Sequence, residues 1–269
     1  MTDDHRAKVD PDVPAPHVFS NAYYARLADI EERHWWSAGI RAIQQRLLDR
    51  IAPSSRTWRV LDAGCGTGLT LTWVKRYTKA EPIGLDRAAA GLEYCRSRGH
   101  MRLLEADTTA LPFASGRFDL VLSCDVIQHL PRPQGDVSAL AEIARVLVPG
   151  GTLLLRTNSR CGYPDDERQL DYHRYLLAEL RDKLAAAGLD TVKASYVNCL
   201  PALVLTAWRN AKREQSSGND PGLAARSGQP AVVRRILYSI LALEGIFLSR
   251  SSASLPFGHS IIALAQKRV

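Results

Sequence analysis

The feature that most constrains this chain is the segment from residue 60 to residue 68, which reads VLDAGCGTG. Val60 and Leu61 indicate the end of a buried strand, and three alternating glycines precede an apolar helical pattern that starts at Leu69. A strand, a glycine-rich loop and a helix in this order form the nucleotide-binding corner of a doubly wound sheet. Glycine permits positive φ angles and lets a ligand approach the backbone. The segment therefore predicts an α/β fold with a Rossmann-like sheet and a ligand at this loop.

The spacing of the glycines says which ligand suits the loop. A dinucleotide fingerprint reads G-x-G-x-x-G and holds a pyrophosphate at a helix N-terminus. Here the spacing is G-x-G-x-G, and Asp62 directly precedes it. A carboxylate at this place would repel a phosphate, so the pattern favours a zwitterionic nucleoside without phosphate. We expect its ammonium group near Asp62 or nearby carbonyls, with its amino-acid part over the glycines.

Further strands follow along the chain. Short apolar segments predict strands at residues 82–86, 103–107 and 118–123. A helix end at Leu147–Val148, a Pro-Gly-Gly turn at residues 149–151 and a fifth strand at residues 152–155 come next. A further helix is predicted to begin at Tyr172–Tyr175 and to end at Gly188. Asp86 ends the second strand about twenty residues after the glycine loop, where a ribose-binding carboxylate belongs.

Five segments resemble the class I S-adenosylmethionine-dependent methyltransferases, and among them the small-molecule, methyltransferase-11-like proteins. These segments are VLDAGCGTG, IGLD, EADTTALPF, FDLVLSCDVIQHL and LVPGGTLLL, and they span about residues 58–157 in family order. The resemblance implies S-adenosylmethionine as cofactor and a seven-stranded sheet. It also implies an antiparallel last strand, predicted at 260–265, inserted between the fifth strand and a sixth at 191–197.

The chain divides into four predicted parts. Residues 1–17 are polar and Pro-rich, and we expect them to be disordered. Residues 18–52 are predicted to form an N-terminal helical lid, and residues 53–199 with 259–269 to form the cofactor-binding domain. Residues 200–258 are predicted to be a helical cap inserted before the last strand. Neither a signal peptide nor a membrane span is evident, so we expect a cytoplasmic protein.

The predicted lid contains two adjacent tryptophans after a histidine, His34-Trp35-Trp36. Neighbouring residues of a helix cannot both face one core, so one tryptophan is expected to face a ligand or another element. The motif resembles a subset of small-molecule methyltransferases in which this segment closes over the cofactor. A structural clamp is the alternative. In that subset an aromatic residue and an arginine usually follow the motif. Here residues 37–40 read SAGI instead, and Arg41 comes slightly later.

The resemblance assigns the carboxyl ends of the first four strands to the cofactor. Asp86 would accept hydrogen bonds from the ribose hydroxyls and Asp107 one from the adenine amino group, while Leu85 and Leu111 flank the ring. The predicted cofactor contacts are Asp62, Gly64, Cys65, Gly66, Gly68, Asp86, Arg87, Asp107, Thr108, Ser123, Cys124, Trp36 and Arg41. The five cysteines are spread singly, which indicates reduced thiols and no metal site.

Two histidines are candidate catalytic bases. His129 follows the fourth strand, where the acceptor is expected, and imidazole can take a proton from a hydroxyl group. The alternative is that His129 only caps or packs the following helix. His34 is the second candidate, reaching in from the lid. In the cap we expect Leu237, Leu241 and Phe247 to line an acceptor pocket, with the protein core or a dimer interface as alternatives.

The charge of the chain and its motifs limit which classes of methyl acceptor are expected. The formal net charge of +7 comes from scattered arginines, and the densest cluster is Arg209, Lys212 and Arg213. No Asn-Pro-Pro-aromatic motif follows the fourth strand, so a nucleic-acid methyltransferase is disfavoured. We expect O-methylation of a small, partly hydrophobic acceptor, such as a secondary metabolite or a lipid-linked or glycan intermediate.

Several alternatives remain open. C- or N-methylation of a small molecule is the first, and a cofactor-binding protein without activity is another. A nicotinamide oxidoreductase is disfavoured by the loop spacing. The cap at residues 200–258 is also a candidate for a dimer contact or a peripheral membrane contact.

Overall fold

The computed structural model describes residues 19–52, 55, 57–131, 133–161, 173–201 and 231–269. The expectations for residues 1–17, for Tyr172, for the Arg209 cluster and for residues 202–230 of the cap lie outside these ranges.

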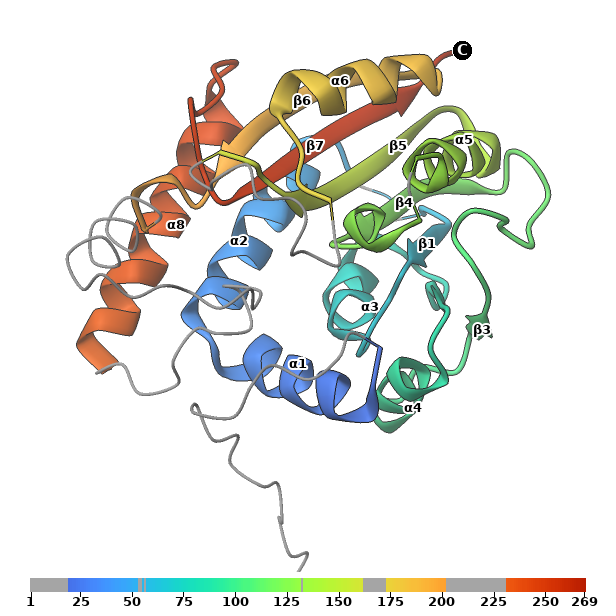
Figure 1. The fold of residues 1–269 in the computed structure, drawn as a ribbon, viewed down its shortest axis with the longest axis horizontal. Helices are drawn as coiled ribbons and strands as arrows, with labels where there is room; N and C mark the ends of the chain where they lie inside the picture. The colour runs from blue at the N-terminus through green and yellow to red at the C-terminus, as the bar shows by residue number, and fades with distance from the viewer. Residues whose placement is uncertain (1–18, 53–54, 56, 132, 162–172, 202–230) are drawn as a thin grey trace, which may run out of the picture.

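A mixed seven-stranded sheet forms the centre of the molecule, with the strand order β3-β2-β1-β4-β5-β7-β6 (Figure 1). Neighbouring strands from β3 to β5 pair in parallel, and β7 pairs antiparallel with both β5 and β6. The antiparallel last strand between the fifth and sixth is therefore confirmed. The strands are β1 Val60–Ala63, β2 Ile83–Asp86, β3 Leu103–Glu105, β4 Phe118–Cys124, β5 Leu147–Asn158, β6 Leu189–Val197 and β7 Ser260–Lys267.

Helices cover both faces of this sheet (Figure 1). The helices are α1 Asn21–Arg33, α2 Trp35–Asp49, α3 Leu69–Val74, α4 Ala89–Ser97, α5 Gly135–Val146, α6 Leu177–Ala186 and α8 Ala231–Arg250, with short 3₁₀ turns η1 Lys75–Tyr77 and η2 Ile127–His129. In a strand, successive side chains point to opposite faces. Accordingly, Leu153 and Leu155 pack with α5 and α6, whereas Leu154 packs with α2 and α8. Two apolar cores result, one on each face.

One of the two helices of the predicted lid belongs to the protein core. This helix, α2, buries Ile40, Ile43 and Leu48 completely against the sheet. Burial of three such side chains stabilises the fold by several kcal/mol, since each contributes about 1.5–3 kcal/mol. A covering segment that moves could therefore include α1 and the turn at His34, but not the body of α2.

Helix α8 packs directly on α2, and the two lie side by side in Figure 1. A Cβ atom at Gly39 would lie 2.5 Å from Leu241 Cδ1, so glycine is what lets the two helices approach this closely. Leu241 is fully buried, whereas Phe247 is 44% exposed. The expectation that Leu241 faces an acceptor pocket is therefore wrong, because its side chain fills this helix contact.

A buried carboxylate fixes α8 to the end of β6. Glu244 accepts hydrogen bonds from the backbone N–H groups of Asn198 and Cys199, both at 2.8 Å, and from that of Leu200 at 3.2 Å. Burial raises the pKa of Glu244, and these three donors oppose the rise. The lone acidic residue of this apolar helix thus has a structural function.

Two segments differ from the sequence-based expectation. Residues 147–151 continue β5 without a helical end, and the shifted register opposite Phe118 and Leu120 accommodates the Pro-Gly-Gly run within the strand. Helix α6 begins at Leu177, because Tyr175 pairs with Ser159 in a β-bridge and is fully buried. The Tyr175 hydroxyl donates to Asp136 at 2.9 Å, which holds that segment extended.

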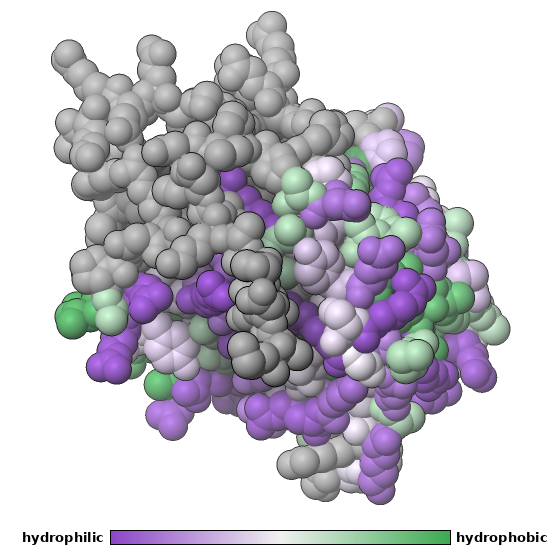
Figure 2. Space-filling model, turned by 90° about the horizontal axis from the view of Figure 1, so that it is seen from below, coloured by the Kyte–Doolittle hydropathy of each residue, from purple (hydrophilic) through white to green (hydrophobic). Residues whose placement is uncertain are grey.

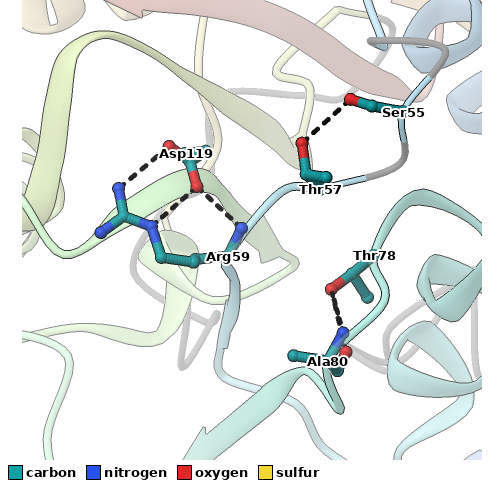
Figure 3. A network of polar contacts seen from close by, with 6 residues as sticks. All are labelled: Ser55, Thr57, Arg59, Thr78, Ala80 and Asp119. Atoms are coloured by element: carbon teal, nitrogen blue, oxygen red, sulfur yellow. Dashed lines mark hydrogen bonds and ion pairs between the residues drawn. The ribbon is translucent and has the colours of Figure 1, made fainter.

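The amino-terminal ends of β1 and β4 are joined by the ion pair in Figure 3. Asp119 Oδ2 accepts from the backbone N–H of Arg59 at 2.8 Å and from its Nε at 2.9 Å, while Oδ1 accepts from Nη2 at 3.0 Å. The pair is exposed, so it stabilises the fold little. It fixes the alignment of two central strands at the edge opposite their carboxyl ends.

The surface seen from below in Figure 2 is largely hydrophilic, and its hydrophobic residues form small separate groups among the coloured atoms. No helix in the described ranges combines the length and apolarity needed to cross a bilayer.

Replacing Glu244 with alanine should destabilise the fold by about 1–3 kcal/mol, because buried N–H groups at Asn198 and Cys199 lose their acceptor. Equilibrium urea unfolding measures the change. Ser239→Ala, at an exposed position of the same helix, should stay within about 0.5 kcal/mol of wild type. Equal stability of Glu244→Ala and wild type would contradict the capping function.

Candidate active site

A cavity of about 230 Å³ lies at the carboxyl ends of the parallel strands, beneath α1 and the start of α2. Ligands bind at this edge in doubly wound sheets. Most predicted site residues line it: His34, Trp36, Arg41, Gly64, Cys65, Gly66, Asp86, Arg87, Asp107, Thr108, Cys124 and His129. Asp62, Gly68 and Ser123 are not among the lining residues of the described chain.

The glycine loop is held tightly at its start. Gly64 has φ 95°, and a Cβ there would lie only 2.2 Å from Val126 Cγ2. The N–H groups of Gly64 and Cys65 both donate to the Leu85 carbonyl, at 2.7 and 2.9 Å. The ends of β1, β2 and β4 thus meet at one point, and only glycine fits between them.

Asp86 organises the next part of the site. Its carboxylate accepts hydrogen bonds from the N–H groups of Gly66 at 2.8 Å and Ala88 at 3.0 Å, and from the Tyr24 hydroxyl at 3.1 Å. Burial raises its pKa and these donors lower it. A carboxylate offers about four acceptor positions, so the Tyr24 hydroxyl competes with the ribose hydroxyls for this carboxylate. Tyr24, on α1, had no sequence signal for this contact.

Negative charge gathers around the glycine loop. Asp62 is 1% exposed, and neither of its oxygens has a hydrogen-bond partner in the described chain. Burial raises the pKa of Asp62, and the nearby Asp86 and Glu31 raise it further. Glu31 itself lines the cavity, and its carboxylate accepts a hydrogen bond from the Thr67 hydroxyl. Such an arrangement suits a ligand that carries positive charge.

An ion pair between the buried Arg156 and Asp125 forms another wall of the cavity. Arg156 Nε donates to Asp125 Oδ1 at 3.1 Å, and its guanidinium lies 5.2 Å from the centre of the Trp36 ring. Next to this pair, Cys124 Sγ accepts from Gln44 Nε2 at 3.0 Å. Burial raises the pKa of the Cys124 thiol to about 12, so it stays protonated. A protonated thiol is a poor nucleophile.

Both tryptophans of the lid motif line the cavity, where the sequence predicted that one of them faces a ligand or another element. Trp35 is 6% exposed and tilts against His34, with ring centres 5.3 Å apart. Because His34 interrupts the helical run between α1 and α2, the following residues begin a new helix whose first turn points into the cavity.

The two candidate bases differ in their surroundings. His34 Nδ1 accepts from the Trp36 N–H at 3.3 Å, which leaves the proton of the neutral ring on Nε2. Burial, and then the charge of Arg234, lower the pKa of His34 to about 4. These features make His34 a hydrogen-bond donor and a weak base. His129 ends η2, and its Nε2 lies 3.3 Å from Nε2 of its neighbour Gln128. Gln128 is itself fixed, since its Oε1 accepts from the Asn158 N–H at 2.8 Å.

Backbone strain concentrates at the cavity. The non-glycine residues with positive φ in the described ranges are Phe19 at 71°, Asp125 at 59° and Asn198 at 63°, and all three line it. Such conformations cost free energy and cluster at functional sites. Phe19 lies between the Arg87 guanidinium, 5.1 Å from its ring centre, and the His129 ring at 6.0 Å. The described chain holds no cluster of three His, Cys, Asp or Glu side chains suited to a metal.

Comparison with known proteins gives the family. A family model described as a methyltransferase domain matches residues 61–155. A malonyl-[acyl-carrier protein] O-methyltransferase from Enterobacter lignolyticus is 33% identical over 199 residues, which cover 69% of this chain and 76% of that protein. The chain therefore belongs to the class I S-adenosylmethionine-dependent methyltransferases. S-adenosylmethionine is the cofactor of this family, and the unpartnered carboxylate of Asp62 beside a carboxylate-lined cavity fits its positive charge.

Other similarities cover different parts of the chain. A probable tRNA methyltransferase 9B from Bos taurus is 38% identical over 96 residues, which are 36% of this chain and 20% of that protein. The match thus spans about a fifth of that relative's length. A putative methyltransferase solved with the Haloferax volcanii Trm112 activator has a TM-score of 0.60 at 19% identity, covering 94% of this chain and 99% of that one. This similarity to the Haloferax volcanii protein shows a shared fold.

Replacing Asp86 with alanine should weaken S-adenosylmethionine binding by about 1.5–3 kcal/mol, the scale of a lost charge-assisted hydrogen bond. Calorimetry on the folded variant measures this. Tyr24→Phe removes the competing hydroxyl and keeps the carboxylate, so it should bind the cofactor at least as tightly as wild type. Unchanged affinity in Asp86→Ala would contradict the ribose assignment.

Proposed function

We propose that this methyltransferase transfers the methyl group to an oxygen atom of a small, partly hydrophobic acceptor. The observation that carries the proposal is a single cavity in which the predicted cofactor residues and His129 meet. Apolar side chains such as Leu27, Ile30 and Leu130 line it beside polar ones. The 33% identical relative named an O-methyltransferase supports oxygen as the acceptor atom.

S-adenosylmethionine, when bound, supplies an activated methyl group that leaves its sulfonium by direct displacement. The protein's task is then alignment and exclusion of water. In this proposal Asp86 holds the ribose, Asp107 and Thr108 lie at the adenine end, and the glycine loop supports the amino-acid part. Asp107 is already ordered for this, since its Oδ1 accepts from the Thr109 N–H and hydroxyl, both at 2.8 Å.

His129 is the better-placed base for a hydroxyl acceptor. It lines the cavity four residues after the strained Asp125, and it is the last residue of η2. A hydroxyl group must lose its proton near the transition state, and an imidazole nitrogen in the cavity can receive it. His34 serves in this proposal as a donor at the lid, because its pKa of about 4 leaves it a poor proton acceptor.

Replacing His129 with asparagine should lower kcat on a hydroxyl acceptor about 100-fold or more and leave cofactor affinity near wild type. Steady-state kinetics and calorimetry on the same preparation give both values. His173→Gln is the matched control, because His173 bonds to Glu179 at 3.0 Å and does not line the cavity. Unchanged turnover in His129→Asn would remove the base and point to an acceptor that is already ionised, such as a carboxylate.

A labelled-methyl assay tests the acceptor class. The probes are phenols and hydroxylated lipids, medium-chain fatty acids, primary amines and total tRNA, each incubated with S-adenosylmethionine carrying a tritiated methyl group. Label in an ether or ester product supports the proposal. Label only in amines would replace it with N-methylation, and label only in tRNA would replace it with a nucleic-acid methyltransferase.

A further inference from the structure

The carboxylate of Glu31 connects the covering helix α1 to the glycine loop. Glu31 lies near the end of α1, and its side chain lines the cavity. It accepts a hydrogen bond from the hydroxyl of Thr67, which stands between Gly66 and Gly68 and is fully buried. A fixed carboxylate therefore faces the cavity at the loop where the amino-acid part of the cofactor is expected.

The two arginines near Glu31 each form an ion pair with another carboxylate. Arg98 and Arg156 both lower the pKa of Glu31, but Arg98 pairs with Glu32 at 3.0 Å and Arg156 pairs with Asp125. Asp125 in turn raises the pKa of Glu31, and Glu31 raises that of Asp62. The negative charge of Glu31 therefore lacks a dedicated counterion among the described residues.

Asp62 is set back from the cavity. Its side chain is buried and is not among the residues that line the cavity in the described chain. Glu31 does line the cavity, and its carboxylate is bonded to the same glycine loop through the Thr67 hydroxyl.

We propose that Glu31 receives the α-ammonium group of S-adenosylmethionine and thereby positions the amino-acid end of the cofactor against the glycine loop. The Thr67 hydroxyl keeps the carboxylate in place by donating to it. Helix α1 then covers the cofactor and also supplies one of its ligands. This role concerns cofactor binding and does not depend on the identity of the acceptor.

The proposal predicts a pH dependence of binding. Burial raises the pKa of Glu31 to about 7, against the lowering effects of Thr67, Arg98 and Arg156. An ammonium group binds the ionised form, so binding releases a proton when the pH lies below that value. Affinity should rise as the pH is raised from 6 to 7, by up to about tenfold per unit, and should level off above pH 7, where the α-ammonium group begins to lose its own proton.

Three ligands separate the contributions of the cofactor's parts. S-adenosylmethionine carries the ammonium group and a sulfonium, S-adenosylhomocysteine carries the ammonium group alone, and 5′-methylthioadenosine carries neither. In Glu31→Gln, calorimetry should show about tenfold weaker binding of the first two and unchanged binding of the third. Glu93→Gln, the same change at an exposed position of the neighbouring helix α4, should leave all three affinities unchanged.

Other patterns would overturn the assignment. Equal loss for all three ligands means that Glu31 acts only by ordering the loop, loss confined to S-adenosylmethionine means that it faces the sulfonium, and no loss means no contact. If Glu31→Gln does not fold, the wild-type protein decides. Proton release and pH dependence must then appear with S-adenosylhomocysteine and not with 5′-methylthioadenosine, and equal behaviour of the two refutes the proposal.

Discussion

The contact between Gly64 and Val126 is the constraint on which the site depends. The ends of β1 and β4 can meet there only because Gly64 has no side chain, and the Leu85 carbonyl of β2 closes the same corner by accepting two N–H groups. With three strand ends fixed together, Asp86 and Cys124 take defined positions around one cavity. The apolar packing on the two sheet faces stabilises the strands, and this contact aligns their ends.

The electrostatics of the cavity follow from how its charges are paired. Arg156 is neutralised by Asp125 and lies over Trp36, so it forms a rigid wall. The carboxylates of Glu31 and Asp62 have no equivalent ion pair in the described chain, and burial disfavours their charge. A cationic ligand therefore stabilises charges that burial disfavours.

Sequence reasoning succeeded where local pattern decides structure. Strand periodicity located β1, β2 and β4, and the glycine spacing excluded a pyrophosphate. It failed where long-range contacts decide. Tyr175 stays extended because its hydroxyl reaches Asp136 across the fold, and Leu241 is buried because Gly39 of another helix admits it. Tyr24 and Glu31 lacked a signal because their site roles depend on how α1 lies over strands far away in sequence. The assignments of Asp86 and His129 remain predictions.

The hydrogen bonds that hold Glu244 to the end of β6 have a consequence for how the length of the chain between β6 and α8 can change. This carboxylate ties the chain just after β6 to α8, and α8 is itself packed on α2 at Gly39. Lengthening a connection between fixed ends costs little free energy, since the entropy of loop closure grows only slowly with length. The anchor at Glu244 therefore holds the chain just after β6 whatever the length of the connection that leads to α8.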